Sequence, residues 1–171
     1  KVYAAELDGV DARLIEVETD VHTGLHTFTI VGLADKALSE SKERINAALK
    51  NSGFKEPSRE NKKIVVNLAP ADIKKAGSQY DLAIALGFLV ASGQVKDFGG
   101  EQYLVLGELA LDGSVRAVSG AMNTAHLAVK QGIPFLIVPG ANAREAAMVS
   151  GVTVYAAHSL NDIVAHLEGN R

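Results

Sequence analysis

The order of strand-like and helix-like patterns constrains the fold of this chain most strongly. Three strand-like segments come first, at residues 2–8, 12–20 and 25–31, where β-branched residues are frequent or apolar and polar side chains alternate. After them, helix and strand patterns alternate to the end of the chain. This order favours one α+β domain of mixed α/β character, in which helices pack on a mixed sheet.

Capping residues and glycines mark the predicted helices. Helix starts are predicted at four polar residues that precede apolar-periodic segments: Asp35, Ser119, Asn142 and Ser159. Glu145 and Asp162 follow the last two at the spacing of a capping box. Gly53 and Gly132 end the first two helices. A further, strongly apolar helix is expected at about residues 80–92.

Four short apolar segments predict the later strands, at 64–68, 103–110, 135–138 and 152–155. The turn Asp112-Gly113 joins the second of them to residues 114–117 as a hairpin. We expect one core, built from the apolar positions of these elements. Its predicted members are Ile30, Ile64, Val66, Leu68, Leu82, Leu86, Leu106 and Ile137.

Composition excludes several classes of protein. The chain has 171 residues, a formal net charge of −3 and no Cys, so disulfides and thiolate metal sites are excluded. The absence of Cys agrees with a reducing compartment, and we expect a cytoplasmic protein. The longest apolar run, 82–91, is far shorter than the roughly 20 residues that span a bilayer, so no membrane partner is expected. Because the first residue is Lys1 rather than Met, we expect a longer parent protein.

Motifs for phosphate, metal or acyl chemistry are missing. No Walker A sequence and no Gly-x-Ser-x-Gly elbow occurs, and Asp97-Phe98-Gly99 lacks the other kinase motifs, so it is interpreted as a turn. His22 and His26 are four apart in a strand region, where that spacing does not make a helical ligand pair. We therefore predict no metal site and no bound cofactor in this chain.

Several motifs in a fixed order resemble the amino-terminal domain of magnesium-chelatase-like AAA+ ATPases of the YifB/ComM type. They are IVGLAD at 30–35, ESKER at 40–44, ALKNSG at 48–53, VNLAPAD at 66–72, YDLAIAL at 80–86, LGEL at 106–109 and IVP at 137–139. The resemblance implies one Lon-type proteolytic-domain-like domain over 1–171, ahead of an AAA+ module in the parent. It also implies a hexameric, ATP- and Mg²⁺-dependent parent ring, which in ComM is a DNA helicase for branch migration in natural transformation.

The same resemblance allows a comparison with the Lon peptidase, whose chemistry needs a Ser hydroxyl beside an unprotonated Lys. Alignment to the Lon motifs places Gly77 at the nucleophile position, with Ser78 one residue away, and Met122 at the Lys position. Lys74 and Lys75 are expected to be solvated, so neither replaces that base. We therefore predict no catalytic residues and no enzymatic activity for this domain.

Two alternatives to a non-catalytic ATPase domain remain at this point. The first is a Ser-Lys peptidase of the Lon type. The second is a small-ligand-binding domain, whose crevice would lie between strand ends near Asn67 and Glu108. Asn67, Asp72, Ser78 and Asp81 surround a strand-to-helix crossing, where they either close turns and cap helices or line a binding site.

Charge is distributed unevenly along the chain. Residues 36–75 contain ten basic and five acidic residues, a net charge of +5, whereas the remainder contains seven basic and fifteen acidic residues, a net charge of −8. Such a segment can attract a phosphate backbone, although a solvated helix and loop would show the same composition. The candidate DNA contacts are Arg59, Lys62, Lys63, Lys74 and Lys75, the first three on a polar loop.

Overall fold

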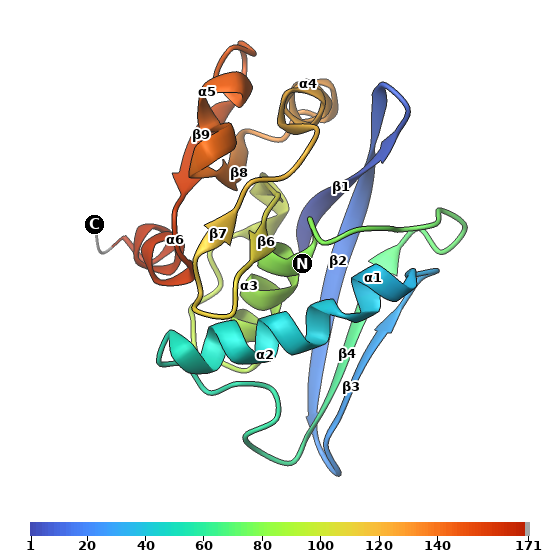
Figure 1. Ribbon diagram of the computed structural model, residues 1–171, viewed down its shortest axis with the longest axis vertical. Helices are drawn as coiled ribbons and strands as arrows, with labels where there is room; N and C mark the ends of the chain where they lie inside the picture. Colours follow the sequence, from blue (N-terminus) through green and yellow to red (C-terminus); the bar gives the residue numbers. More distant parts are fainter. Residues whose placement is uncertain (170–171) are drawn as a thin grey trace.

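The computed structural model describes residues 1–169 and contains a mixed seven-stranded sheet with the order β3-β4-β2-β1-β5-β8-β9 (Figure 1). Strand β2 is antiparallel to both of its neighbours, β1 and β4, and the other neighbouring pairs are parallel. The strands are β1 Val2–Asp8, β2 Asp11–Thr23, β3 Thr27–Val31, β4 Lys62–Ala69, β5 Tyr103–Val105, β8 Phe135–Pro139 and β9 Thr153–Ala157. A separate hairpin pairs β6 Glu108–Leu109 with β7 Val115–Arg116.

Within residues 1–169, six α-helices lie between and after these strands. They are α1 Lys36–Ser39, α2 Ser41–Asn51, α3 Asp81–Ala91, α4 Ala121–Gln131, α5 Ala143–Ala146 and α6 Leu160–Leu167. Two 3₁₀ turns, η1 Gly100–Gln102 and η2 Gly140–Asn142, complete the described elements. The predicted α+β fold with a mixed sheet is confirmed.

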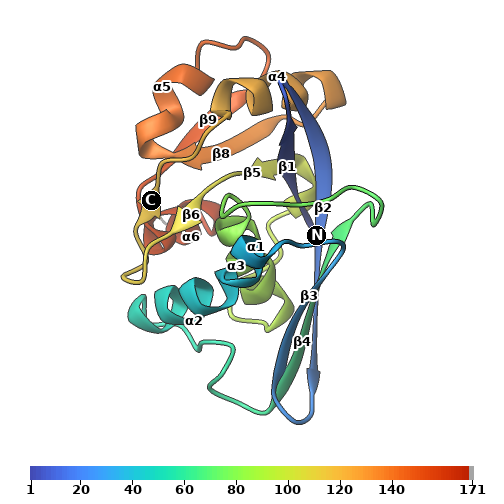
Figure 2. The same ribbon diagram turned by 45° about the vertical axis from the view of Figure 1, so that its right-hand side comes forward.

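Two cores lie on opposite faces of the sheet because successive side chains of a strand point to opposite faces. Ala4 belongs to the larger core with α2, α3 and α6, whereas Ala5 belongs to the smaller core with α4 and α5. Figure 2 shows α2 and α3 beside the lower half of the sheet and α4 and α5 at the other end of the molecule. Seven of the eight predicted core residues are buried, and Ile30 is half-buried because β3 is an edge strand.

Local details differ from expectation where distant contacts decide the conformation. The segment predicted as one strand at 103–110 ends as β5 at Val105, and the chain then leaves the main sheet to form β6. The predicted hairpin through Asp112-Gly113 is confirmed as β6 and β7. The first predicted helix is divided at Glu40 into α1 and α2.

Two of the four predicted helix caps are confirmed. Asp35 accepts a hydrogen bond from Leu38 N at 2.7 Å, and Ser159 accepts one from Asp162 N at 3.1 Å. The prediction for Ser119 is wrong, because the N-cap of α4 is Gly120, which adopts a left-handed conformation. Asn142 precedes α5 but makes no capping bond, because its side chain instead bonds both the backbone N–H and C=O of Val118.

None of the helices in residues 1–169 is both long and apolar enough to cross a membrane.

Candidate functional site

A hollow of about 360 Å³ opens where the parallel strands β1 and β5 end. Most of its wall comes from three parts of the chain: the end of β1 at 5–7, the loop at 76–79, and the segment 117–119 that leads into α4. Leu106, just after β5, and Thr124 of α4 complete it. Strand β1 continues into β2 on one side, whereas β5 leads toward β8 on the other. Ligands of open α/β sheets bind in crevices beyond the carboxyl ends of parallel strands, so this hollow is the candidate site.

Glu6 organises the loop that forms one wall of the hollow. Its carboxylate accepts hydrogen bonds from Tyr80 Oη at 2.6 Å and from Ala76 N at 3.1 Å. Tyr80 is fully buried, and this burial, together with the negative charge of Glu6, raises the pKa of the phenol above its ordinary value. The loop is therefore held by a carboxylate and a neutral phenol at the start of α3.

Ser78, the hydroxyl closest in sequence to the predicted nucleophile position, donates a hydrogen bond to the Glu108 carboxylate. Glu108 also lies 3.9 Å from the guanidinium of Arg116, on the other strand of the hairpin. Met122, at the position predicted for the catalytic lysine, is partly buried and packs against the smaller core. Among the described residues that line the hollow there is no lysine. Of the two predicted strand ends, the one near Glu108 lies close to this hollow, and Asn67 does not line it.

Lys75 corrects a prediction, because it was expected to be solvated and is fully buried. Its ammonium donates hydrogen bonds to the backbone oxygens of Gly32, at 2.7 Å, and Pro70. Burial disfavours the charged form and lowers the pKa of Lys75 from its ordinary value. The ammonium therefore links the backbone at Gly32 to the backbone at Pro70. Lys75 does not line the hollow, and because it is buried it cannot contact a phosphate at the protein surface.

Asp81 forms a buried ion pair with Arg44, a contact that sequence reasoning missed. Its carboxylate, which is fully buried, accepts from Arg44 Nε at 2.7 Å and from Leu109 N at 3.0 Å. Arg44 also donates to Ser41 Oγ at 3.0 Å. Burial raises the pKa of Asp81, and the bonds from Arg44 oppose that effect. The pair joins α2, α3 and β6, so Asp81 has a structural role.

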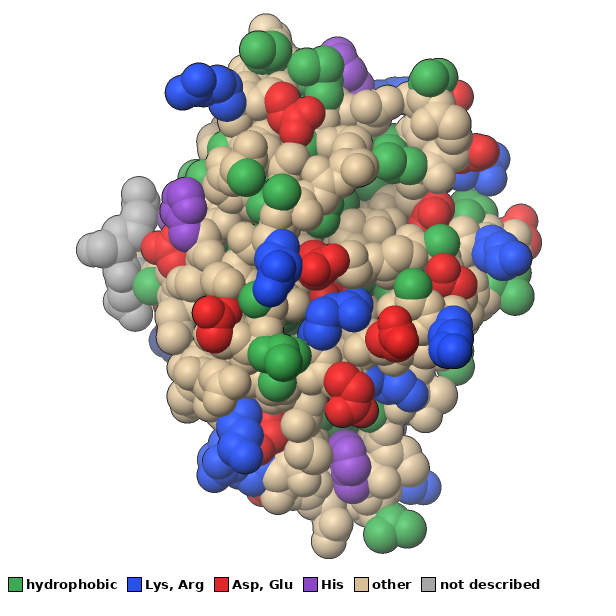
Figure 3. Space-filling model, in the orientation of Figure 1, with side chains coloured by type: hydrophobic (Ala, Val, Ile, Leu, Met, Phe, Trp, Pro, Cys, Tyr) green, Lys and Arg blue, Asp and Glu red, His purple; other side chains and the backbone are tan. Residues whose placement is uncertain are grey.

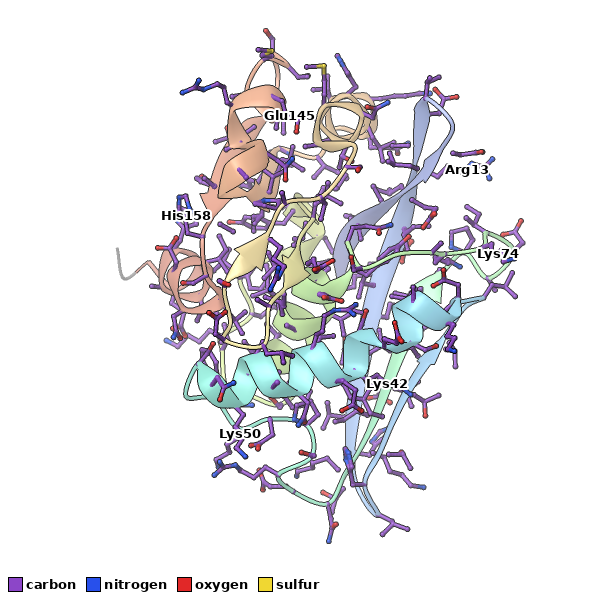
Figure 4. All side chains as sticks on the ribbon, viewed as in Figure 1. Arg13, Lys42, Lys50, Lys74, Glu145 and His158 are labelled. Atoms are coloured by element: carbon purple, nitrogen blue, oxygen red, sulfur yellow. The ribbon has the colours of Figure 1, made fainter. Side chains whose placement is uncertain are left out.

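The remaining basic candidates do not form one patch. Lys62 and Lys63 are the first residues of β4 rather than part of the loop, and Arg59 is paired with Glu56 at 2.7 Å. Lys74 lies on the loop that follows the other end of β4, at the right of Figure 4. On the face shown in Figure 3, Lys and Arg side chains alternate with Asp and Glu side chains. The structure thus separates Lys74 from the basic end of β4.

Residues 1–169 contain no group of three or more His, Asp or Glu side chains placed to hold a metal ion. The sequence likewise has no Walker A loop.

Comparison with known proteins identifies the family. The family model described as subunit ChlI of Mg-chelatase matches residues 17–142. This chain belongs to the ChlI family. This chain is 41% identical over 168 residues to competence protein ComM of Haemophilus influenzae. The match covers 98% of this chain and 32% of ComM. The chain is 40% identical over 161 residues to YifB of Salmonella typhimurium and to YifB of Escherichia coli, in each case covering 94% of this chain and 31% of the relative. The chain thus spans about a third of these relatives, and it is a magnesium-chelatase-like sequence of the ComM and YifB kind.

Proposed function

We propose that this chain is the non-catalytic amino-terminal domain of a YifB/ComM-type AAA+ ATPase. One observation carries the proposal: the hollow at the strand ends holds Ser78 hydrogen-bonded to a carboxylate, and no lysine is present among its described lining residues. A Ser-Lys peptidase would need an amine at that position to accept the hydroxyl proton. Lys75 cannot supply it because its ammonium is bonded to two backbone oxygens elsewhere.

The proposal includes the parent protein. Residues 1–171 would form one Lon-type domain, and ATP and Mg²⁺ would be bound by an AAA+ module outside this chain. The parent would be a cytoplasmic homo-oligomer, a hexameric ring that drives a DNA helicase or branch-migration reaction. The similarity to a competence protein and the match to the ChlI family support this part.

Peptide cleavage tests the non-catalytic assignment. The full-length parent, supplied with ATP and Mg²⁺, should leave casein and fluorogenic peptides intact, because the group beside the Ser78 hydroxyl is the Glu108 carboxylate and not the amine of a Ser-Lys peptidase. Ser78→Ala should leave this result and ATP hydrolysis unchanged. Cleavage by the parent that disappears in Ser78→Ala would mean that the hollow is a peptidase site.

We also propose that the basic end of β4 contacts DNA in the parent. Lys62 and Lys63 adjoin the loop that carries Arg59, and Lys63 is exposed. The ion pair with Glu56 partly neutralises the positive charge of Arg59, so we expect Arg59 to contribute less to DNA binding than the two lysines. Such contacts would be weak and independent of base sequence. Lys74 would act as a separate contact at the other end of the strand.

Replacing Arg59, Lys62 and Lys63 together with Ala should weaken binding of the parent to DNA. Each phosphate contact that is lost should reduce the log–log salt slope by about 0.7–0.9. Fluorescence anisotropy with single- and double-stranded DNA over a salt series measures this slope. Lys130→Ala, an exposed lysine on α4, is the matched control and should leave the slope unchanged. An unaltered slope in the triple variant would exclude this end of β4 as the contact.

A further inference from the structure

The loop at 52–61 joins α2 to β4 and lies at the bottom of Figure 1. Pro57 is the only apolar side chain of residues 55–61, and Glu56 and Pro57 are the only buried residues in this range. A hollow of about 440 Å³ lies between this loop and the end of α3. Because the loop buries so little apolar surface, packing alone does not fix its position.

Gln94 holds the backbone of this loop at Lys55. Its side-chain oxygen accepts a hydrogen bond from Lys55 N at 2.8 Å, and its side-chain nitrogen donates one to Lys55 O at 3.0 Å. The same nitrogen lies 3.1 Å from Ser92 Oγ at the end of α3. One amide side chain thus pairs both backbone groups of Lys55, as a neighbouring strand would.

Two further contacts hold the middle and the end of the loop. Ser58 N donates a hydrogen bond to Asn46 Oδ1 of α2 at 3.0 Å. Asn61 O accepts one from Gly24 N, in the turn between β2 and β3, at 3.0 Å. The loop backbone is therefore ordered by contacts to α2, to the end of α3 and to the sheet.

Lys55 carries a charge that no ion pair in the described chain neutralises. Its side chain is exposed, and the ion pairs of residues 1–169 do not include it. Arg59 differs, because Glu56 pairs with it at 2.7 Å. Lys55 and Lys62 line the same hollow, where Glu60 opposes part of their charge. The fold therefore brings Lys55 to the basic end of β4.

We propose that Lys55 is a further phosphate contact at this end of β4 and that Gln94 is its positioning residue. The inference rests on the proposed DNA contact of Lys62 and Lys63. A backbone that is already ordered loses less conformational entropy on binding, so a lysine on it binds a phosphate more tightly than one on a mobile loop. Such a contact orients the protein on DNA without reading the base sequence.

Replacing Lys55 with Ala in the full-length parent should lower the log–log salt slope of DNA binding by about 0.7–0.9, the loss of one phosphate contact. The substitution keeps both bonds between Gln94 and the Lys55 backbone. Fluorescence anisotropy over a salt series measures the slope. Lys130→Ala, at an exposed lysine on α4, is the matched control and should leave the slope unchanged. An unchanged slope in Lys55→Ala would overturn the assignment of Lys55.

Gln94→Met tests the positioning role, because it removes both bonds to the Lys55 backbone without changing the net charge. It should weaken DNA binding and lower the salt slope in the wild-type parent. In the Lys55→Ala parent it should cause no further loss, since the side chain that Gln94 positions is already gone. Gln131→Met, at an exposed glutamine on α4, is the control and should have no effect. Equal losses in both backgrounds would show that Gln94 has only a structural role.

The results separate this inference from the DNA proposal on which it rests. If replacing Arg59, Lys62 and Lys63 together lowers the salt slope and Lys55→Ala does not, DNA contacts this end of β4 and Lys55 is not one of the contacts. If the wild-type parent binds no DNA, both the DNA proposal and this inference are wrong.

Discussion

Replacing Arg44 with Met should lower the free energy of unfolding by about 3–5 kcal/mol, the cost of leaving a buried charge without its partner. Asp81 is fully buried, and Arg44 supplies two of its hydrogen bonds, at 2.7 and 3.1 Å. Without Arg44, the carboxylate keeps only the bond from Leu109 N among these contacts. Urea unfolding near neutral pH, followed by circular dichroism, measures the loss.

The same variant should show a characteristic dependence on pH. Burial already raises the pKa of Asp81, and removal of the opposing guanidinium raises it further. A raised pKa in the folded state means that the folded protein binds this proton more tightly than the unfolded chain does. Stability from such a group is present at low pH and is lost as pH rises through the folded-state pKa. The loss in Arg44→Met should therefore shrink between neutral pH and about pH 5.

A double variant provides the control for this ion pair. Arg44→Met combined with Asp81→Leu removes both charges, so it should recover a large part of the stability that Arg44→Met loses. If Arg44→Met unfolds at the same urea concentration as the wild-type chain, the pair does not hold α2 to α3. A loss that is the same at both pH values would show that the unpaired carboxylate is not its cause.

Truncation of Leu86 to Ala should lower the free energy of unfolding by about 2–5 kcal/mol. Leu86 is fully buried in α3, which packs between α2 and the sheet, so its removal leaves a cavity that rigid neighbours cannot fill. Leu82→Ala should behave similarly. Denaturant unfolding measures both variants against Leu111→Ala, the same substitution at a site that is 57% exposed, which should change stability by no more than about 0.5 kcal/mol. Equal stability of Leu86→Ala and Leu111→Ala would contradict the position of α3 in the core.

Features that depend on sequence neighbours were predictable. The cap at Asp35, the strand pattern of 64–68 and the hairpin through Asp112-Gly113 are local, and the structure has all three. The end of the strand expected at 103–110 was not predictable, because the second half of this segment pairs with β7 instead of continuing in the main sheet. Apolar residues are common to both environments, so the pattern could not show where β5 ends.

The site was harder to predict because its contacts join distant segments. Arg44 and Asp81 are 37 residues apart, and Lys75 reaches Gly32 across 43 residues. Lys75 resembles its neighbour Lys74 in sequence, yet only the fold shows that its ammonium is enclosed by backbone oxygens. Had an acceptor-rich turn been expected around Gly32, a buried lysine would have been a reasonable hypothesis. Residue type alone therefore indicates charge but not burial.

Labelling of Ser78 by a fluorophosphonate is the most direct test of the central claim, that this ChlI-family domain is non-catalytic. These probes react with serines that a neighbouring base activates. Ser78 donates to the Glu108 carboxylate, which is a weaker base than a neutral lysine amine. Lys74 is exposed, and the Lys75 ammonium is bonded to backbone oxygens away from Ser78. Mass spectrometry of the labelled full-length parent should find Ser78 unmodified, with or without ATP. A stoichiometric adduct on Ser78 that is absent from Ser78→Ala would contradict the claim.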